Sequence, residues 1–91
     1  MSPQLKLQPA KLATTSCDRT ACLLFLDGDL SAVLVRLDEE AHGHERGSWF
    51  LEIGFGPCEV TPPPLFATMD AAQTWVLARH EQTKPPALTA V

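Results

Sequence analysis

The sequence predicts an α+β domain in which a three-stranded antiparallel meander carries one C-terminal helix on one face, in the order β-β-β-α. Three observations favour this fold. Two apolar runs flank a turn at Asp27-Gly28, an aromatic segment alternates with period two over residues 48–55, and apolar residues recur at helical spacing over residues 70–80. A sheet and a helix that each have one apolar side can bury those sides by packing against each other as two layers.

Size and composition predict one domain with a modest core. The chain has 91 residues, of which 45% are apolar and 20% charged, as in ordinary globular proteins. We expect the domain to span residues 17–82. An extended or disordered arm, interrupted by prolines, is expected over residues 1–16, and a tail after the second proline pair over residues 83–91. Both ends are expected to be flexible.

The first two strands form the most direct prediction. Residues 20–26 and 30–37 are apolar runs of strand length, separated by Asp27-Gly28-Asp29. Glycine and aspartate tolerate positive φ, and two β-rich runs around Asp-Gly are typical of a hairpin. Asp27 and Asp29 could also be paired catalytic carboxylates, but a turn that points into water implies no pocket around them.

The third strand and the helix follow from spacing and end signals. In residues 48–55 the larger apolar side chains alternate, and Gly56-Pro57 ends the run. The helix is expected over Asp70–His80, with Thr68 as its N-cap and Asp70 at the positive end of its dipole. Its apolar face carries Ala72, Trp75 and Val76, and we expect it to cover residues on two strands: Val33, Val35, Leu37, Trp49, Leu51, Ile53 and Phe55.

That assignment leaves apolar residues on the other face of the sheet. Leu34 and Phe50 are expected there, together with Arg36 and Glu52, which could pair across strands. A large exposed apolar patch usually marks an interaction site, so these four residues are candidates for binding a protein partner or a second copy. The alternative is that the N-terminal arm folds back over this face.

The charge of the chain is concentrated in its middle. The net charge is −4, and residues 27–59 carry eight acids against Arg36 and Arg46, a local net charge of −6. Direct nucleic-acid binding is therefore not expected, because it depends on Lys and Arg neutralising phosphates. The cluster Asp38-Glu39-Glu40 is either a solvated loop or a surface that meets a basic partner.

No motif predicts an enzyme, a cofactor or a metal site. His42-Gly43-His44 resembles a fragment of a metal site, but two ligands in an acidic loop favour a solvated loop over a zinc site. The three cysteines, Cys17, Cys22 and Cys58, have no CxxC spacing and are expected to be reduced thiols.

One resemblance concerns layout. An aromatic strand, Trp-Phe-Leu-Glu-Ile, occupies residues 49–53, and residues 66–75 place Phe-x-Thr before an Ala-rich helix with Trp75. This layout is similar to that of small sheet-plus-helix domains at the N-terminus of phage-type integrases. The resemblance covers roughly residues 30–80 and implies the architecture. Those domains bind DNA through a basic sheet, whereas this region is acidic.

The sequence thus predicts a small non-enzymatic protein-interaction module that binds a protein partner, or itself as a homodimer, through the helix-free face and the acidic loop. The alternative is an acidic inhibitor or nucleic-acid mimic from a phage or mobile element that blocks a basic groove on another protein. No apolar run reaches membrane-spanning length, and residues 1–8 lack the apolar core of a signal peptide, so a cytoplasmic location is expected.

Overall fold

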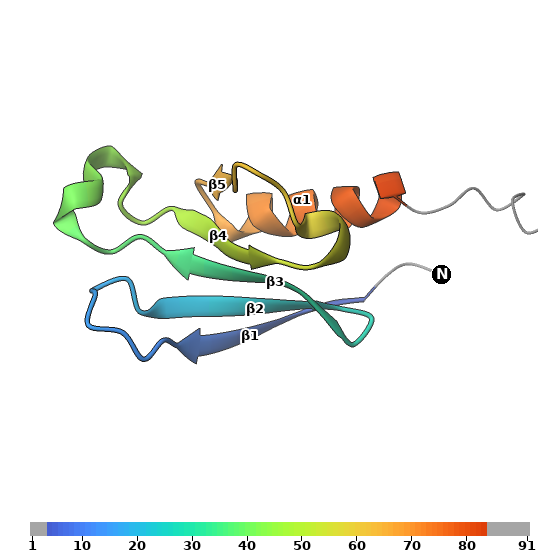
Figure 1. Cartoon of the computed structure of the whole chain (residues 1–91), viewed down its shortest axis with the longest axis horizontal. Coiled ribbons are helices and arrows are strands. Elements are labelled where there is room, and N and C mark those ends of the chain that lie inside the picture. The colour runs from blue at the N-terminus through green and yellow to red at the C-terminus, as the bar shows by residue number, and fades with distance from the viewer. Residues whose placement is uncertain (1–3, 84–91) are drawn as a thin grey trace, which may run out of the picture.

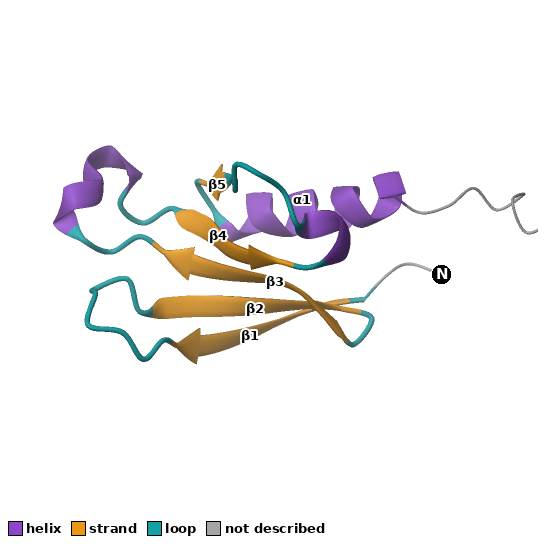
Figure 2. Ribbon diagram, in the orientation of Figure 1, coloured by secondary structure: helices purple, strands orange, loops and turns teal. Residues whose placement is uncertain are grey.

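A computed structural model describes residues 4–83 and shows an α+β fold: an antiparallel sheet and one C-terminal helix (Figures 1 and 2). The sheet has five strands in sequence order rather than the expected three. The strands are β1 (Leu5–Lys11), β2 (Thr20–Leu26), β3 (Asp29–Arg36), β4 (Trp49–Gly54) and β5 (Leu65–Phe66), the helix is α1 (Met69–Thr83), and two 3-10 turns are η1 (Glu40–Glu45) and η2 (Gly56–Cys58).

Strand β1 lies within the segment expected to be an arm. It pairs with β2 along its whole length, from Leu5 opposite Leu26 to Lys11 opposite Thr20. The sheet therefore begins before residue 17. Most β1 side chains are exposed, because the strand lies at the edge of the sheet, and this exposure explains why its sequence shows no clear alternation. Of the expected C-terminal tail, residue 83 is the last residue of the helix, and residues 84–91 lie outside the described part of the chain.

The direction of the β1 backbone follows from its two ends. The N–H of Leu12 donates to the carbonyl of Arg19, and the N–H of Asp27 donates to the carbonyl of Gln4. Because backbone groups alternate in direction along a strand, the even-numbered residues of β1 face β2 and the odd-numbered residues face the free edge. Pro9 therefore stands where a missing N–H removes no bond within the sheet.

The hairpin between β2 and β3 is confirmed. Asp27 and Gly28 connect the strands with φ of 51° and 91°. Two consecutive positive φ values match the two-residue turns whose twist fits a hairpin, and Asp-Gly is among the sequences that adopt them most easily. This turn lies at the end of the sheet opposite the β1–β2 and β3–β4 connections (Figure 1).

The core lies between the sheet and α1. Leu24, Leu34 and Leu51 come from three neighbouring strands, are 0–2% exposed, and cluster with Ala72 and Val76 of the helix. Fully burying a leucine stabilises a fold by about 1.5–3 kcal/mol, so these three side chains contribute much of the driving force for packing. The helical residues Ala72 and Val76 are buried as predicted.

The alternation of β3 is the reverse of the expected one. Ala32 and Leu34 lie under the helix, so the prediction that Val33, Val35 and Leu37 face it is wrong. Strand β3 is apolar on both faces, and its alternation alone could not determine which set the helix covers.

Strand β4 changes face partway along. Val33 is opposite Ile53 and Leu34 is opposite Leu51, so Glu52 is an extra residue in a β-bulge. Leu51 packs in the core, whereas Ile53 lies with Val33 on the opposite face and is 47% exposed. The prediction that Ile53 lies under the helix with Leu51 is therefore wrong.

Beyond the bulge, β4 makes a close backbone contact. A Cβ placed on Gly54 would lie 2.0 Å from the carbonyl oxygen of Cys58, which is fully buried. Gly54 therefore allows η2 to fold against the end of β4. Phe55, also expected in the core, is 44% exposed at this corner.

Helix α1 begins as predicted. The Oγ1 of Thr68 accepts a hydrogen bond from the N–H of Ala71 at 3.1 Å, the geometry of an N-cap. Trp75 packs on Phe66 with ring centroids 5.5 Å apart, and the guanidinium of Arg79 lies 5.8 Å from the Trp75 ring. In the described part of the chain, no helix has the length and apolar character needed to cross a membrane.

Candidate functional site

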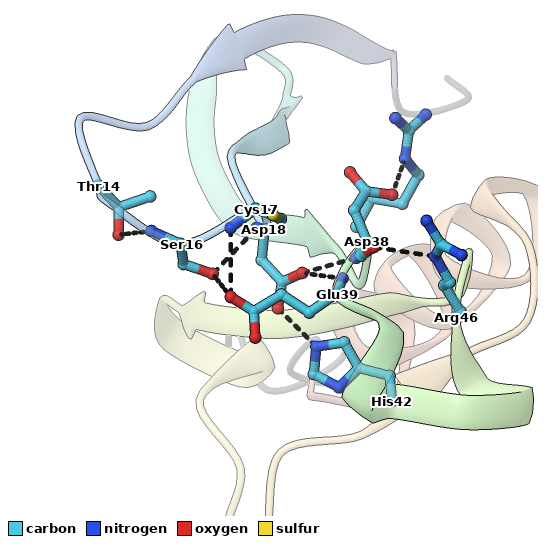
Figure 3. Close-up of polar contacts among 9 residues, drawn as sticks. Thr14, Ser16, Cys17, Asp18, Asp38, Glu39, His42 and Arg46 are labelled. Carbon is cyan, nitrogen blue, oxygen red and sulfur yellow. Dashed lines mark hydrogen bonds and ion pairs between the residues drawn. The ribbon is translucent and has the colours of Figure 1, made fainter.

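Two loops meet at one end of the sheet. The β1–β2 loop contributes residues 12–19, and the β3–β4 connection contributes residues 37–48, which include η1 (Figures 1 and 3). We call this hydrogen-bonded pair of loops the loop clamp. The contacts between the two loops join residues 20 or more positions apart, so tertiary structure rather than local sequence creates them.

Asp18 is the main link of the loop clamp. Its Oδ1 accepts hydrogen bonds from the N–H groups of Asp38 at 2.6 Å and Glu39 at 2.9 Å. Its Oδ2 lies 2.6 Å from Nε2 of His42, which donates to it (Figure 3). One carboxylate thus satisfies two backbone donors and orients an imidazole.

The pKa of Asp18 reflects these contacts. Burial by itself would raise the pKa, but the hydrogen bond from His42 and those from the N–H groups of Asp38 and Glu39 hold it below its ordinary value of 3.8. The carboxylate is therefore ionised at neutral pH, when all three hydrogen bonds need an acceptor.

Glu39 makes the reciprocal contact. Its Oε1 accepts a hydrogen bond from Oγ of Ser16 at 2.6 Å and another from the N–H of Cys17 at 3.2 Å. Ser16 Oγ in turn accepts the N–H of Asp18 at 3.0 Å. Each loop therefore supplies a carboxylate that accepts at least one backbone N–H of the other.

Asp38 is held from two sides. Its Oδ1 accepts a hydrogen bond from Nε of Arg36 at 2.8 Å, and its backbone carbonyl accepts one from Nε of Arg46 at 2.9 Å. The expected pairing of Arg36 with Glu52 across strands is therefore wrong, because Arg36 lies opposite Trp49 and pairs with Asp38.

The loop clamp does not have the geometry of a catalytic triad. Although Asp18 orients His42, Ser16 donates its hydroxyl proton to Glu39, and no hydrogen bond between Ser16 and His42 occurs in the structure. Within residues 4–83, no group of three metal-binding side chains converges. His42 faces Asp18, and its neighbour His44 is exposed. These contacts fix the two loops against each other.

The sheet face away from α1 is the second feature of this region, and we call it the open face. Residues that lie opposite one another across the strands form two transverse rows on it. Ten side chains are involved, nearly all apolar. The first row is Ala10, Ala21, Val35, Phe50 and Leu65, and the second is Gln8, Leu23, Val33 and Ile53, with Glu52 at the bulge.

A groove lies where the open face meets the loop clamp. Its volume is about 620 Å³, and it is open to solvent rather than enclosed. Val35, Phe50 and Leu65 of the first row form part of its floor. The rest of its lining comes from Leu12, Thr14, Ser16 and Asp18 of the first loop, from Leu37, His42 and Glu45 of the second, and from Glu52 of β4.

The predicted partner-binding residues have different positions. Phe50 lies on the open face and Glu52 lines the groove, whereas Leu34 is completely buried under the helix, so its placement on the uncovered face is wrong. Asp38 and Glu39 belong to the loop clamp. Glu40, at the start of η1, is exposed.

Sequence reasoning missed Asp18, Ser16 and Leu65. A usable signal for the first two was the polar segment beside a strand, because Ser and Asp side chains frequently bind backbone N–H groups in tight loops. Leu65 had no signal, since its strand has two residues and follows a run of prolines.

Comparison with known proteins gives no further guide to this site. No family model matches the chain, and no curated protein or solved structure shows significant similarity to it.

Proposed function

We propose that this protein is a non-enzymatic interaction module that binds a protein partner through the open face. The observation that carries the proposal is the pair of apolar rows. The first row crosses all five strands without a polar residue; Ala21 and Val35 in it are buried, but Phe50 is partly exposed and Leu65 is 38% exposed. In the second row Leu23 and Val33 are partly exposed and Ile53 is 47% exposed. Contiguous apolar surface of this kind is uncommon on proteins that have no partner.

The edges of the sheet favour binding on the face over binding at an edge. A partner strand added to β1 would meet Pro9, which has no N–H to donate, between Lys6 and Lys11. At the other edge, β5 has only two residues and follows the proline run that ends at Pro64, so it offers a partner strand very little backbone to pair with. Addition of a strand is therefore unfavourable at both edges.

The pairing of the acids argues against the nucleic-acid mimic. A mimic must display carboxylates where phosphates would lie, but those of Asp18 and Glu39 accept hydrogen bonds inside the loop clamp, and that of Asp38 pairs with Arg36. That alternative stays a prediction of the sequence without a specific contact in its favour.

A matched pair of surface substitutions tests the proposal. Ile53→Lys and Leu23→Lys place a charge on the second row of the open face, whereas Leu7→Lys places the same charge at a 40% exposed leucine on the other side of the sheet. We expect the two open-face variants to lose a partner, or self-association, that wild type and Leu7→Lys retain, with affinity reduced roughly tenfold or more.

The measurements are sedimentation velocity of the purified chain and quantitative capture from the native host, compared across the four proteins. Circular dichroism of each variant controls for folding. Identical sedimentation and identical captured proteins for all four would contradict the proposal.

A further inference from the structure

The groove beside the loop clamp has a chemical character that the rest of the open face lacks. Its floor is apolar, but its rim carries Asp18, Glu45 and Glu52. Among the described residues no lysine or arginine lines it, and the imidazole of His42 is already engaged with Asp18. A ligand seated there meets apolar surface below and negative charge at the sides.

Two of the rim acids are available to a ligand. Glu45 and Glu52 are exposed, and within residues 4–83 neither has an ion pair or a side-chain hydrogen bond. In this they differ from Asp18 and Glu39, whose carboxylates are occupied by the loop clamp. Carboxylates that stand unpaired beside an apolar floor complement a cationic ligand with an apolar part.

The shape of the groove favours a peptide over a small molecule. Its volume of about 620 Å³ lies within the range of ligand pockets, but small ligands are usually buried by 70–90% or more, which an open groove does not provide. A polypeptide can place one apolar side chain on the floor and close the open side with its own backbone.

The loop clamp also keeps the rim in place before a ligand arrives. The three backbone N–H groups that donate to the carboxylates of Asp18 and Glu39 fix both loops, and Leu12 and Leu37 extend the floor between them. Loops that are ordered in advance lower the entropic cost of binding.

We infer that the groove binds a basic peptide segment of a partner protein, with an apolar side chain on the floor formed by Val35, Phe50 and Leu65 and Lys or Arg side chains paired with Glu45 and Glu52. This inference rests on the proposed function, because it names the chemistry of the partner at one end of the open face.

Nuclear magnetic resonance titration of the full chain with three peptides tests it. The first probe is Gly-Ser-Lys-Phe-Leu-Lys-Arg-Gly-Ser, the second replaces its three basic residues with Glu, and the third keeps them but replaces Phe-Leu with Gly-Ser. We expect the first alone to shift the amide signals of Leu37, Glu45 and Phe50 in a saturable way, and to bind more weakly at high salt.

Charge variants identify the groups responsible. Glu45→Gln and Glu52→Gln are expected to raise the dissociation constant of the first peptide roughly threefold each and roughly tenfold together. Glu81→Gln removes an exposed acid on α1 and should leave it unchanged. Because all three side chains are exposed, these variants should fold as wild type does.

Four outcomes would overturn the inference. The first two are equal shifts with all three peptides and no shift with any of them. The third is binding of phenethylammonium as tight as that of the first peptide, which would make the groove a small-molecule site, and the fourth is a shift of the same signals with protein concentration alone, which would place a second copy of the chain there. None of these outcomes changes the loss of partner binding expected for Ile53→Lys, because Ile53 does not line the groove. The proposed function can therefore fail or survive separately.

Discussion

At the scale of single residues, Asp18 shows how one carboxylate can organise a surface. It satisfies the N–H groups of Asp38 and Glu39 and also holds His42. The two N–H groups follow β3, so the acceptor fixes the direction in which the chain leaves the sheet. Glu39 then repeats the arrangement from the other loop through Ser16 and Cys17, which makes the contact reciprocal.

Asp18→Ala should therefore destabilise the fold. The substitution leaves two partly buried backbone donors without their acceptor, at a cost of about 1–3 kcal/mol. Urea unfolding monitored by tryptophan fluorescence measures the change. Glu40→Ala, in the same region but exposed, serves as the control and should change the free energy of unfolding by less than about 0.5 kcal/mol.

The effect of Asp18→Ala should depend on pH in one direction. Hydrogen bonds hold the pKa of Asp18 below its ordinary value of 3.8 in the folded protein, so folding favours the ionised form. The stabilisation is complete above the unfolded pKa and is lost as pH falls through the folded pKa. The difference between wild type and variant should shrink as the pH falls below about 4. A difference that grows below about pH 4 would contradict this account.

At the scale of elements, β4 depends on two local features that together place η2 and the open face. The bulge at Glu52 separates Leu51 from Ile53, and Gly54 then passes directly against the carbonyl of Cys58. The bulge moves apolar side chains out of the core, and the glycine lets the chain turn back over it.

Gly54→Ala should be poorly tolerated. Its methyl group would lie 2.0 Å from a main-chain oxygen of Cys58, which cannot move away as a flexible side chain could. We expect a loss of about 1–3 kcal/mol in the free energy of unfolding, as in other overpacked sites. Glu59→Ala, at an exposed residue beside Cys58, serves as the control, and thermal unfolding compares the two. An equal loss in both variants would remove the steric explanation.

How far the elements could be predicted from the sequence depended on how local their causes are. The hairpin at Asp27-Gly28 and the helix start at Thr68 follow from the chemistry of neighbouring residues, and both predictions are confirmed. The face of β3 was not predictable, because Leu34 and Val35 are equally apolar. Strand β1 was missed because Pro9 is tolerated only at a free edge, which the sequence does not reveal.

The candidate site was harder to predict from the sequence for the same reason. Phe50 could be placed on the open face from alternation, and the structure agrees. The loop clamp joins Asp18 to residues 20 or more positions away, and such pairing has no periodic signal. Leu34 was assigned to the surface because the choice of face on β3 was reversed.

At the scale of the whole molecule, the three cysteines differ in exposure. Cys17 lies exposed in the loop clamp, whereas Cys22 and Cys58 are buried in the core under α1. Burial raises the pKa of both buried thiols, an effect only partly offset by an N–H of Gln8 at Cys22 and by Arg79 near Cys58. The buried thiols are thus both inaccessible and protonated.

Thiol labelling should consequently report global unfolding. With a disulfide reagent at about pH 8, near the ordinary thiol pKa, we expect one thiol to react fast and two only as the fold opens. All three should react at once in denaturant. Cys17→Ser should abolish the fast phase, and a second fast thiol in the native protein would show that the core opens more readily than its burial implies.

The position of Pro9 has a consequence for how this protein can assemble. Apolar sheets are prone to grow into fibres when strands are added one after another along an unprotected border. Here one border lacks a donor at Pro9, and the other is the two-residue strand β5, which directly follows Pro64. Two copies that meet through their apolar sides would bury the same surface on each, so assembly would stop at a closed pair instead of continuing as a filament.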